Sequence, residues 1–175
     1  IIADPSSDPN GYTNNRKRWM ENHPSIASTV THSVFMPNES QEIAPAHSVD
    51  IVLTFRNVHN WLPTASQENA FKTFFKALKP GGVLGVVEHR ANSKIKFDPK
   101  SGYVPESEVI RLAKLAGFKL EAKSEINANP KDSTSHPLGV WTLPPRLKLG
   151  ETDKDKYLKI GESDRMTLKF IKPTK

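Results

Sequence analysis

The feature that most constrains the fold is a pair of apolar runs on either side of an amphipathic segment. Residues 50–55 (DIVLTF) and 83–89 (VLGVVEH) are dominated by apolar side chains, a pattern typical of strands buried on both faces. Between them, residues 65–79 carry aromatic and aliphatic side chains at helical spacing. We expect Pro80-Gly81-Gly82 to end this helix, because glycine supplies the positive φ that a helix C-terminus often needs. We therefore expect two adjacent parallel strands joined by a helix that packs on the sheet.

The rest of the chain continues the alternation of strand and helix. Strands are expected at residues 1–4, 28–35, 119–126 and 165–172, and helices at residues 14–23 and 105–117. The last strand alternates apolar and polar residues, which suits an edge strand, and we expect it to run antiparallel in the same sheet. This order predicts an α/β fold with a doubly wound, mostly parallel sheet. We expect one domain over residues 1–175, in which residues 127–149 form a long, proline-rich loop.

The composition excludes several functional classes. The 175 residues contain no cysteine, which rules out disulfides, thiolate nucleophiles and thiolate metal sites. No apolar stretch reaches the roughly 20 residues that span a bilayer. The formal net charge is +6, but lysines are interleaved with acids, for example in residues 150–165, so a mixed-charge surface is favoured over a nucleic-acid footprint. The compartment stays open, with the cytoplasm as the default, and the sequence does not decide whether a targeting segment precedes Ile1.

Four motifs carry a resemblance to a known family. They are RNVHNW at residues 56–61, LKPGG at 78–82, SEINANPKDSTSHPLGVWTLPP at 124–145 and IGESDRMTLKFIKP at 160–173. In this combination, the chain from Ile1 to Lys175 resembles class I S-adenosylmethionine-dependent methyltransferases, and among them a family of bacterial predicted methyltransferases. The resemblance implies a Rossmann-like fold with an antiparallel last strand, S-adenosylmethionine as the cofactor, and methyl transfer. The acceptor is not identified; a small molecule is favoured over a nucleic acid.

The chain departs from this family at its start. The family carries a first strand and a glycine-rich loop upstream of the acid that ends its second strand; here Asp4 would be that acid, and nothing precedes Ile1. The resemblance therefore implies an N-terminally incomplete sheet, in which a central strand is missing between residues 1–4 and 51–55. Two open strand edges invite association. We therefore expect either that an upstream segment accompanies the chain as a separate piece, or that another strand, from the same chain or from a second copy in a homo-oligomer, fills the gap. We also expect the chain as given to bind S-adenosylmethionine weakly or not at all.

Two other classes of function are alternatives to methyl transfer for a chain with these residues. A nicotinamide-dependent oxidoreductase would share an acid at a strand tip, but the sequence contains no Tyr-x-x-x-Lys pair. A non-catalytic, degenerate methyltransferase fold that serves as a binding or interaction module is the remaining alternative. A glycine-rich loop in the intact protein would favour the enzyme.

The resemblance implies cofactor contacts at the ends of several strands. Asp4 would accept hydrogen bonds from the ribose hydroxyls, although the segment that it begins, DPSSDPNG, is rich in turn formers. Asn38 and Glu39 would line the adenine ring of the cofactor; the alternative is that they belong to a plain surface loop. Phe55 and Asn57 would lie near the methyl group that is transferred.

Arg56, Asn57 and His59 are the predicted catalytic residues. Methyl transfer depends on positioning and requires no protein nucleophile. If the acceptor must lose a proton, His59 is the best-placed base, because imidazole titrates near neutral pH. The alternative is that His59 packs against or caps the following helix.

A further group of residues is predicted to form the acceptor site or a lid: Trp61, Glu88, His89, Arg90, His136 and Trp141. Residues 88–90 form either the polar floor of the acceptor site or an internal ion-pair network. Residues 127–149 form either a lid, with Trp141 as its apolar cover and Asp164-Arg165 as its anchor, or a structured connection. No metal site is expected, because Asp132, His136 and Glu88 lack the spacing of a recognised ligand set.

Overall fold

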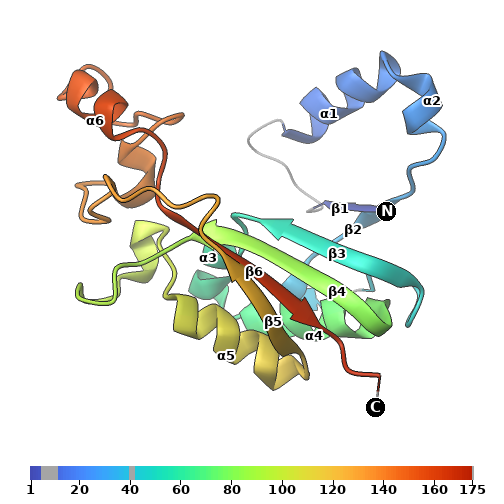
Figure 1. The fold of residues 1–175 in the computed structure, drawn as a ribbon. Coiled ribbons are helices and arrows are strands. Elements are labelled where there is room, and N and C mark those ends of the chain that lie inside the picture. Colours follow the sequence, from blue (N-terminus) through green and yellow to red (C-terminus); the bar gives the residue numbers. More distant parts are fainter. Residues whose placement is uncertain (5–11, 40–41, 175) are drawn as a thin grey trace.

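The computed structural model describes residues 1–4, 12–39 and 42–174, and its elements follow the alternation expected from the sequence (Figure 1). The strands are β1 (Ile2–Asp4), β2 (His32–Val34), β3 (Val49–Phe55), β4 (Leu78–His89), β5 (Lys119–Ser124) and β6 (Arg165–Ile171). The α-helices are α1 (Tyr12–Glu21), α2 (Pro24–Ala27), α3 (Val58–Trp61), α4 (Gln67–Ala77), α5 (Glu106–Ala116) and α6 (Lys154–Ile160). Short 3-10 helices lie at η1 (Pro37–Glu39), η2 (Leu62–Thr64), η3 (Pro99–Ser101) and η4 (Gly139–Thr142). None of the helices within these described ranges is long and apolar enough to cross a membrane.

The main sheet has four strands in the order β3-β4-β6-β5. β3 and β4 are parallel neighbours, with Phe55 opposite Val87, as the sequence predicts. β6 runs antiparallel to both β4 and β5, which confirms a mostly parallel α/β sheet with an antiparallel last strand. The expectation that β6 is an edge strand is wrong, because β6 lies between β4 and β5. Its alternation instead reflects one face that packs into the core.

The core lies between this sheet and helices α4 and α5, which cover one of its faces (Figure 1). Phe71 and Phe74 of α4 and Leu112 of α5 are buried against Leu84 of β4 and Phe170 of β6. Burial of apolar area of this kind contributes about 25 cal/mol per Å². The predicted helical spacing of residues 65–79 therefore corresponds to a real buried face.

The helix between β3 and β4 ends earlier than the sequence predicts. α4 ends at Ala77, and Leu78 is already extended, with φ −70° and ψ 140°. The chain then turns at Gly81, whose φ of 80° is a conformation that glycine adopts without steric cost. The Pro-Gly-Gly corner thus belongs to the start of β4.

One expectation about β3 is wrong. The strand was predicted to be buried on both faces, but it forms the edge of the four-stranded sheet, on the side where the resemblance implies a missing central strand. Ile51, Leu53 and Phe55, which alternate along it, are 59%, 60% and 55% exposed. An apolar run predicts burial, but the described residues supply no second layer over this face.

β1 and β2 form a separate, parallel two-stranded sheet. Phe35, just after β2, ties this sheet to the main core, because its ring contacts those of Trp61 and Phe74 at centroid distances of 5.8 and 5.3 Å. A hollow of about 180 Å³ lies between the two sheets, and its walls include Ala3 and Leu53. Within the described ranges, β1 and β3 each have one edge without a strand partner. A strand that fills this gap stays a prediction.

Candidate active site

Polar side chains gather where β3 and β4 end. The backbone N–H of Arg56 donates to the carbonyl oxygen of Val87 at 2.7 Å, which keeps the chain beside β4 after β3 ends. Arg56 adopts a φ of 55°, so the chain turns sharply, and α3 begins at Val58. His59, in the first turn of α3, therefore comes to lie beside the last residues of β4.

Glu88 is a carboxylate with no exposed surface. It accepts hydrogen bonds from the backbone N–H of His59 at 3.2 Å, from Nδ1 of His59 at 3.0 Å and from the backbone N–H of His89 at 2.8 Å. A buried charge is costly unless donors surround it, and these three donors reduce that cost. Glu88 is thus fixed as an acceptor at the end of an otherwise apolar strand.

The pairing with Glu88 determines which nitrogen of His59 is free. An ionised carboxylate only accepts hydrogen bonds, so Nδ1 of His59 carries the proton in this pair. In the neutral ring, Nε2 is then the acceptor. His59 is buried, with 9% of its surface exposed, and a histidine held this way by a carboxylate has the arrangement of a general base.

His89 lies next to this pair. Its ring centroid is 5.3 Å from that of His59, and its Nδ1 is 2.5 Å from Oγ of Ser163. Burial, together with the nearby positive charges of Arg56 and Arg165 and with repulsion from His59 whenever that ring is protonated, lowers the pKa of His89 to about 3. His89 is therefore neutral at ordinary pH.

The segment of residues 127–149 reaches the same site. The indole ring of Trp141, in η4, meets the ring of His59 edge to face at a centroid distance of 6.1 Å. The structure thus brings together Trp141 and the predicted base, which are far apart in the sequence. The indole ring thus covers one side of the imidazole.

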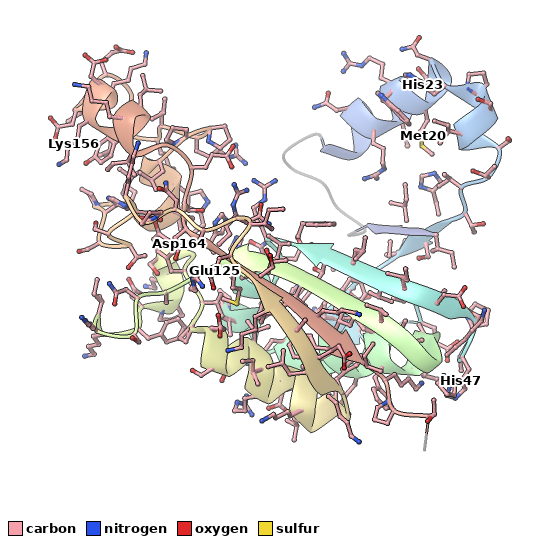
Figure 2. The ribbon with its side chains drawn as sticks, viewed as in Figure 1. Met20, His23, His47, Glu125, Lys156 and Asp164 are labelled. Carbon is pink, nitrogen blue, oxygen red and sulfur yellow. The ribbon has the colours of Figure 1, made fainter. Side chains whose placement is uncertain are left out.

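Arg90 takes part in an internal ion-pair network, one of the two alternatives that the sequence leaves open for residues 88–90. Figure 2 shows Asp164 and Glu125 close to one another near the ends of β6 and β5. Arg90 joins them: its Nε is 2.9 Å from Asp164, and its two terminal nitrogens are 2.9 and 2.6 Å from Glu125. These hydrogen bonds from Arg90 lower the pKa of Glu125. Arg90 is therefore part of an ion-pair network, whereas Glu88 and His89 lie beside His59.

His136 lies in the anchor of the 127–149 segment. Its Nε2 is 2.8 Å from the buried carboxylate of Asp132, which also accepts hydrogen bonds from the hydroxyl of Tyr103 and the backbone N–H of Asp164. Asp164 in turn accepts from the backbone N–H of Asn129 at 2.8 Å. These contacts fasten the segment to the start of β6, where an anchor was expected.

The predicted cofactor-binding residues lie on β1, in η1 and at the end of β3. Asp4 ends β1, but its side chain lies outside the described residues. Asn38 and Glu39 are exposed in η1. Phe55 is 55% exposed, and Asn57 lines the hollow and donates from Nδ2 to Oγ1 of Thr54 at 3.2 Å.

Trp61 also lines this hollow, and its ring packs against those of Phe35 and Phe74. Two residues that the sequence did not suggest also lie beside His89: Ser163, and Tyr103, whose ring lies 6.4 Å from that of His89. Neither carries a local sequence signal, since each reaches the site only through the tertiary fold.

Comparison with known proteins supports the fold. No protein-family model matches the chain, and no curated protein sequence matches it. A solved S-adenosylmethionine-dependent methyltransferase from Methanosarcina mazei superposes with a TM-score of 0.53 at 14% identity, over 82% of this chain and 68% of that one. A candidate sarcosine dimethylglycine methyltransferase from Galdieria sulphuraria superposes with a TM-score of 0.60 at 14% identity, over 99% of this chain and 70% of that one. The chain has the class I methyltransferase fold.

The same fold also occurs in a protein with another activity. The [4+2]-cyclase SpnF is similar to this chain with a TM-score of 0.56 at 15% identity, over 88% of this chain and 61% of SpnF. The chain thus spans between 61% and 70% of these three structures. At such identities the methyltransferase fold is shared, and the activity has to be argued from the residues.

Proposed function

We propose that this protein transfers a methyl group from S-adenosylmethionine to a small-molecule acceptor at the ends of β3 and β4, with His59 as the general base. The observation that carries the proposal is the buried His59–Glu88 pair, whose Nδ1–Oε1 distance is 3.0 Å. The class I methyltransferase fold supports it, because ligands in such sheets bind beyond the carboxyl ends of the strands.

In this proposal the chain's own residues handle the proton of the acceptor. When bound, S-adenosylmethionine supplies a methyl group on a positively charged sulfur. Nε2 of His59 takes the proton from the attacking acceptor atom, because Nδ1 already donates to Glu88. The imidazolium that results stays beside the Glu88 carboxylate, which stabilises the new positive charge. Trp141, whose ring contacts that of His59, excludes water from one side of the imidazole.

The hollow between the two sheets fits such a cofactor only in part. It lies beside Asn57 at the end of β3, but its volume of about 180 Å³ is below the roughly 300–1,000 Å³ of most ligand pockets. We infer that the site needs a further strand between β1 and β3, with a loop that approaches the cofactor. On its own, the chain of 175 residues would then bind S-adenosylmethionine weakly.

A second candidate is a non-catalytic binding or interaction module with the same fold. The specific observation in its favour is the pair of open strand edges at β1 and β3, since such edges readily accept another chain. A module would keep the fold and its open edges without binding the cofactor. Cofactor affinity therefore distinguishes the two candidates.

The catalytic proposal is tested with the protein in its natural length. His59→Gln should slow methyl transfer by roughly 10²–10⁴-fold, the usual contribution of a general base, and leave cofactor affinity unchanged. Asp4→Ala should instead weaken cofactor binding by about 1.5–3 kcal/mol, through the loss of charge-assisted hydrogen bonds. His32→Gln, at an exposed histidine of β2, is the control and should change neither quantity. Equal losses of affinity in the two test variants would show that the roles are assigned wrongly.

A further inference from the structure

Three side chains at the ends of β3 and β4 offer metal-ligand atoms in one place. One such atom from each of His59, Glu88 and His89 lies within 4.8 Å of the other two. Ligands of Zn²⁺ lie at about 2.0–2.2 Å from the ion, which separates tetrahedral ligands by roughly 3.4 Å. Small side-chain rotations would bring all three atoms to a common ion. We propose that His59, Glu88 and His89 form a binding site for a divalent transition-metal ion.

The donor set suits this class of ion. Two imidazoles and one carboxylate favour zinc, iron, cobalt or nickel over calcium and magnesium, which prefer oxygen ligands. Nδ1 of His59 and Oε1 of Glu88, 3.0 Å apart, hold one proton between them. The bound ion takes the place of that proton, which is released to solvent. Two backbone N–H groups continue to orient the carboxylate.

His89 has the contact expected of a metal-ligating histidine. Such a residue almost always donates its second ring N–H to an oxygen, which fixes the ring and its tautomer. Nδ1 of His89 lies 2.5 Å from Oγ of Ser163, so Nε2 is left for the ion. This contact is independent of the His59–Glu88 pair and points to the same site.

Three protein ligands leave a coordination position open, as in catalytic rather than structural metal sites. Binding of the ion does not rest on the proposed methyl transfer, and it can occur whether or not the protein is an enzyme. With the ion bound, His59 is a ligand and no longer a free base. The ion would lower the pKa of an oxygen acceptor at the open position, so that its proton could pass to solvent without a protein base.

The sequence predicts no metal site, because its ligands show no local spacing. His59 and Glu88 are 29 residues apart and meet only because β3 and β4 are parallel neighbours. Of the three residues considered from the sequence and rejected, Glu88 belongs to the cluster proposed here. Asp132 and His136 pair with one another, and the Asp132 carboxylate also accepts hydrogen bonds from Tyr103 and the backbone of Asp164.

The proposal is tested by calorimetric titration of the metal-depleted protein with Zn²⁺, and with Co²⁺ to record the absorption bands of a nitrogen- and oxygen-ligated ion. We expect one ion per chain. His89→Asn and Glu88→Gln, which remove ligands, should weaken affinity by more than roughly 100-fold, and Ser163→Ala by roughly 10–100-fold. His136→Asn is the matched control, because it removes a buried imidazole that is paired with a carboxylate outside the cluster.

Circular dichroism checks that each variant is folded. If Glu88→Gln is unfolded, the Zn²⁺ affinity of His89→Asn alone tests the proposal. Absence of stoichiometric binding by the unaltered protein would overturn the proposal. A loss of affinity in His136→Asn equal to that in His89→Asn would overturn it as well, since the binding would then not be at this cluster. Neither result depends on whether methyl transfer is detected.

Discussion

Glu88 ends an apolar strand with a carboxylate that has no exposed surface, and three donors face it. Its position decides the orientation of His59 and, through the backbone, the start of α3. Burial of this carboxylate costs free energy, and its hydrogen bonds orient the His59 ring, as in other carboxylate–histidine pairs.

The cost of disturbing this arrangement is measurable. Glu88→Ala leaves two buried backbone N–H groups and one imidazole N–H without an acceptor, so it should lower the free energy of unfolding by about 2–5 kcal/mol. Glu121→Ala, at an exposed carboxylate of β5, should change it by less than about 0.5 kcal/mol. Urea denaturation of the two variants provides the comparison. Similar values for both would mean that the donors around Glu88 find other partners at little cost.

For single residues, the sequence could predict candidate site residues but not which of them contact one another. His59 and Glu88 were both expected at strand ends, and the parallel register of β3 and β4 brings them together. The choice for residues 88–90 between an acceptor floor and an ion-pair network could not be made from the sequence. It depends on Asp164 and Glu125, which lie 74 and 35 residues from Arg90.

Among the elements, the segment of residues 127–149 is fastened at several points and contains η4. Gly139, at the start of η4, adopts a φ of 57°, and a Cβ atom there would lie 2.0 Å from the carbonyl oxygen of Ser101. The close approach of η4 to η3 therefore requires glycine. Trp141, which contacts His59, is held by the same 3-10 helix.

This contact can be broken selectively. Gly139→Ala should displace η4 and increase the rate of proteolytic cleavage within residues 127–149, because a backbone clash cannot be relieved by a side-chain rotation. Gly150→Ala is the matched control: its φ is 62°, but no atom lies within 4 Å of the added Cβ. The control should cost about 1–2 kcal/mol for the left-handed backbone alone and leave cleavage nearly unchanged. Equal cleavage of the two variants would show that η4 is not held by this approach.

Periodicity predicted the elements better than their surroundings. The spacing of Phe71 and Phe74 identified α4 and its buried face, and the alternation along β6 identified a strand with one buried face. The end of α4 was misjudged by two residues, because the extended backbone begins at Leu78 before the Pro-Gly-Gly corner. The exposure of β3 could not be predicted, since an apolar run does not reveal whether a second layer covers it.

For the molecule as a whole, the most consequential feature is the division of the strands into two sheets. β1 and β3 each present an unpaired edge within the described ranges, and Leu53 and its alternate neighbours on β3 are more than half exposed. An unprotected apolar edge of this kind is a template for pairing with another strand. We therefore expect the chain to associate through β3.

Association can be measured by sedimentation equilibrium. The weight-average mass of the chain should rise above 19.6 kDa with concentration, and Leu53→Lys should suppress the rise, since a lysine on an edge strand opposes pairing. Ile126→Lys, at an isoleucine that is 82% exposed outside β3, is the control and should have no effect. A constant mass of 19.6 kDa, or equal suppression by both variants, would contradict association through β3.

The central claim, that this fold carries a methyltransferase site, is tested most directly by calorimetric titration of the protein in its natural length with S-adenosylhomocysteine. The account predicts saturable binding of one ligand per chain, unchanged in His59→Gln and weakened by roughly 10–100-fold in Asp4→Ala, which corresponds to the loss of a charge-assisted contact. Absence of binding by the unaltered protein would contradict the claim and favour a non-catalytic binding module.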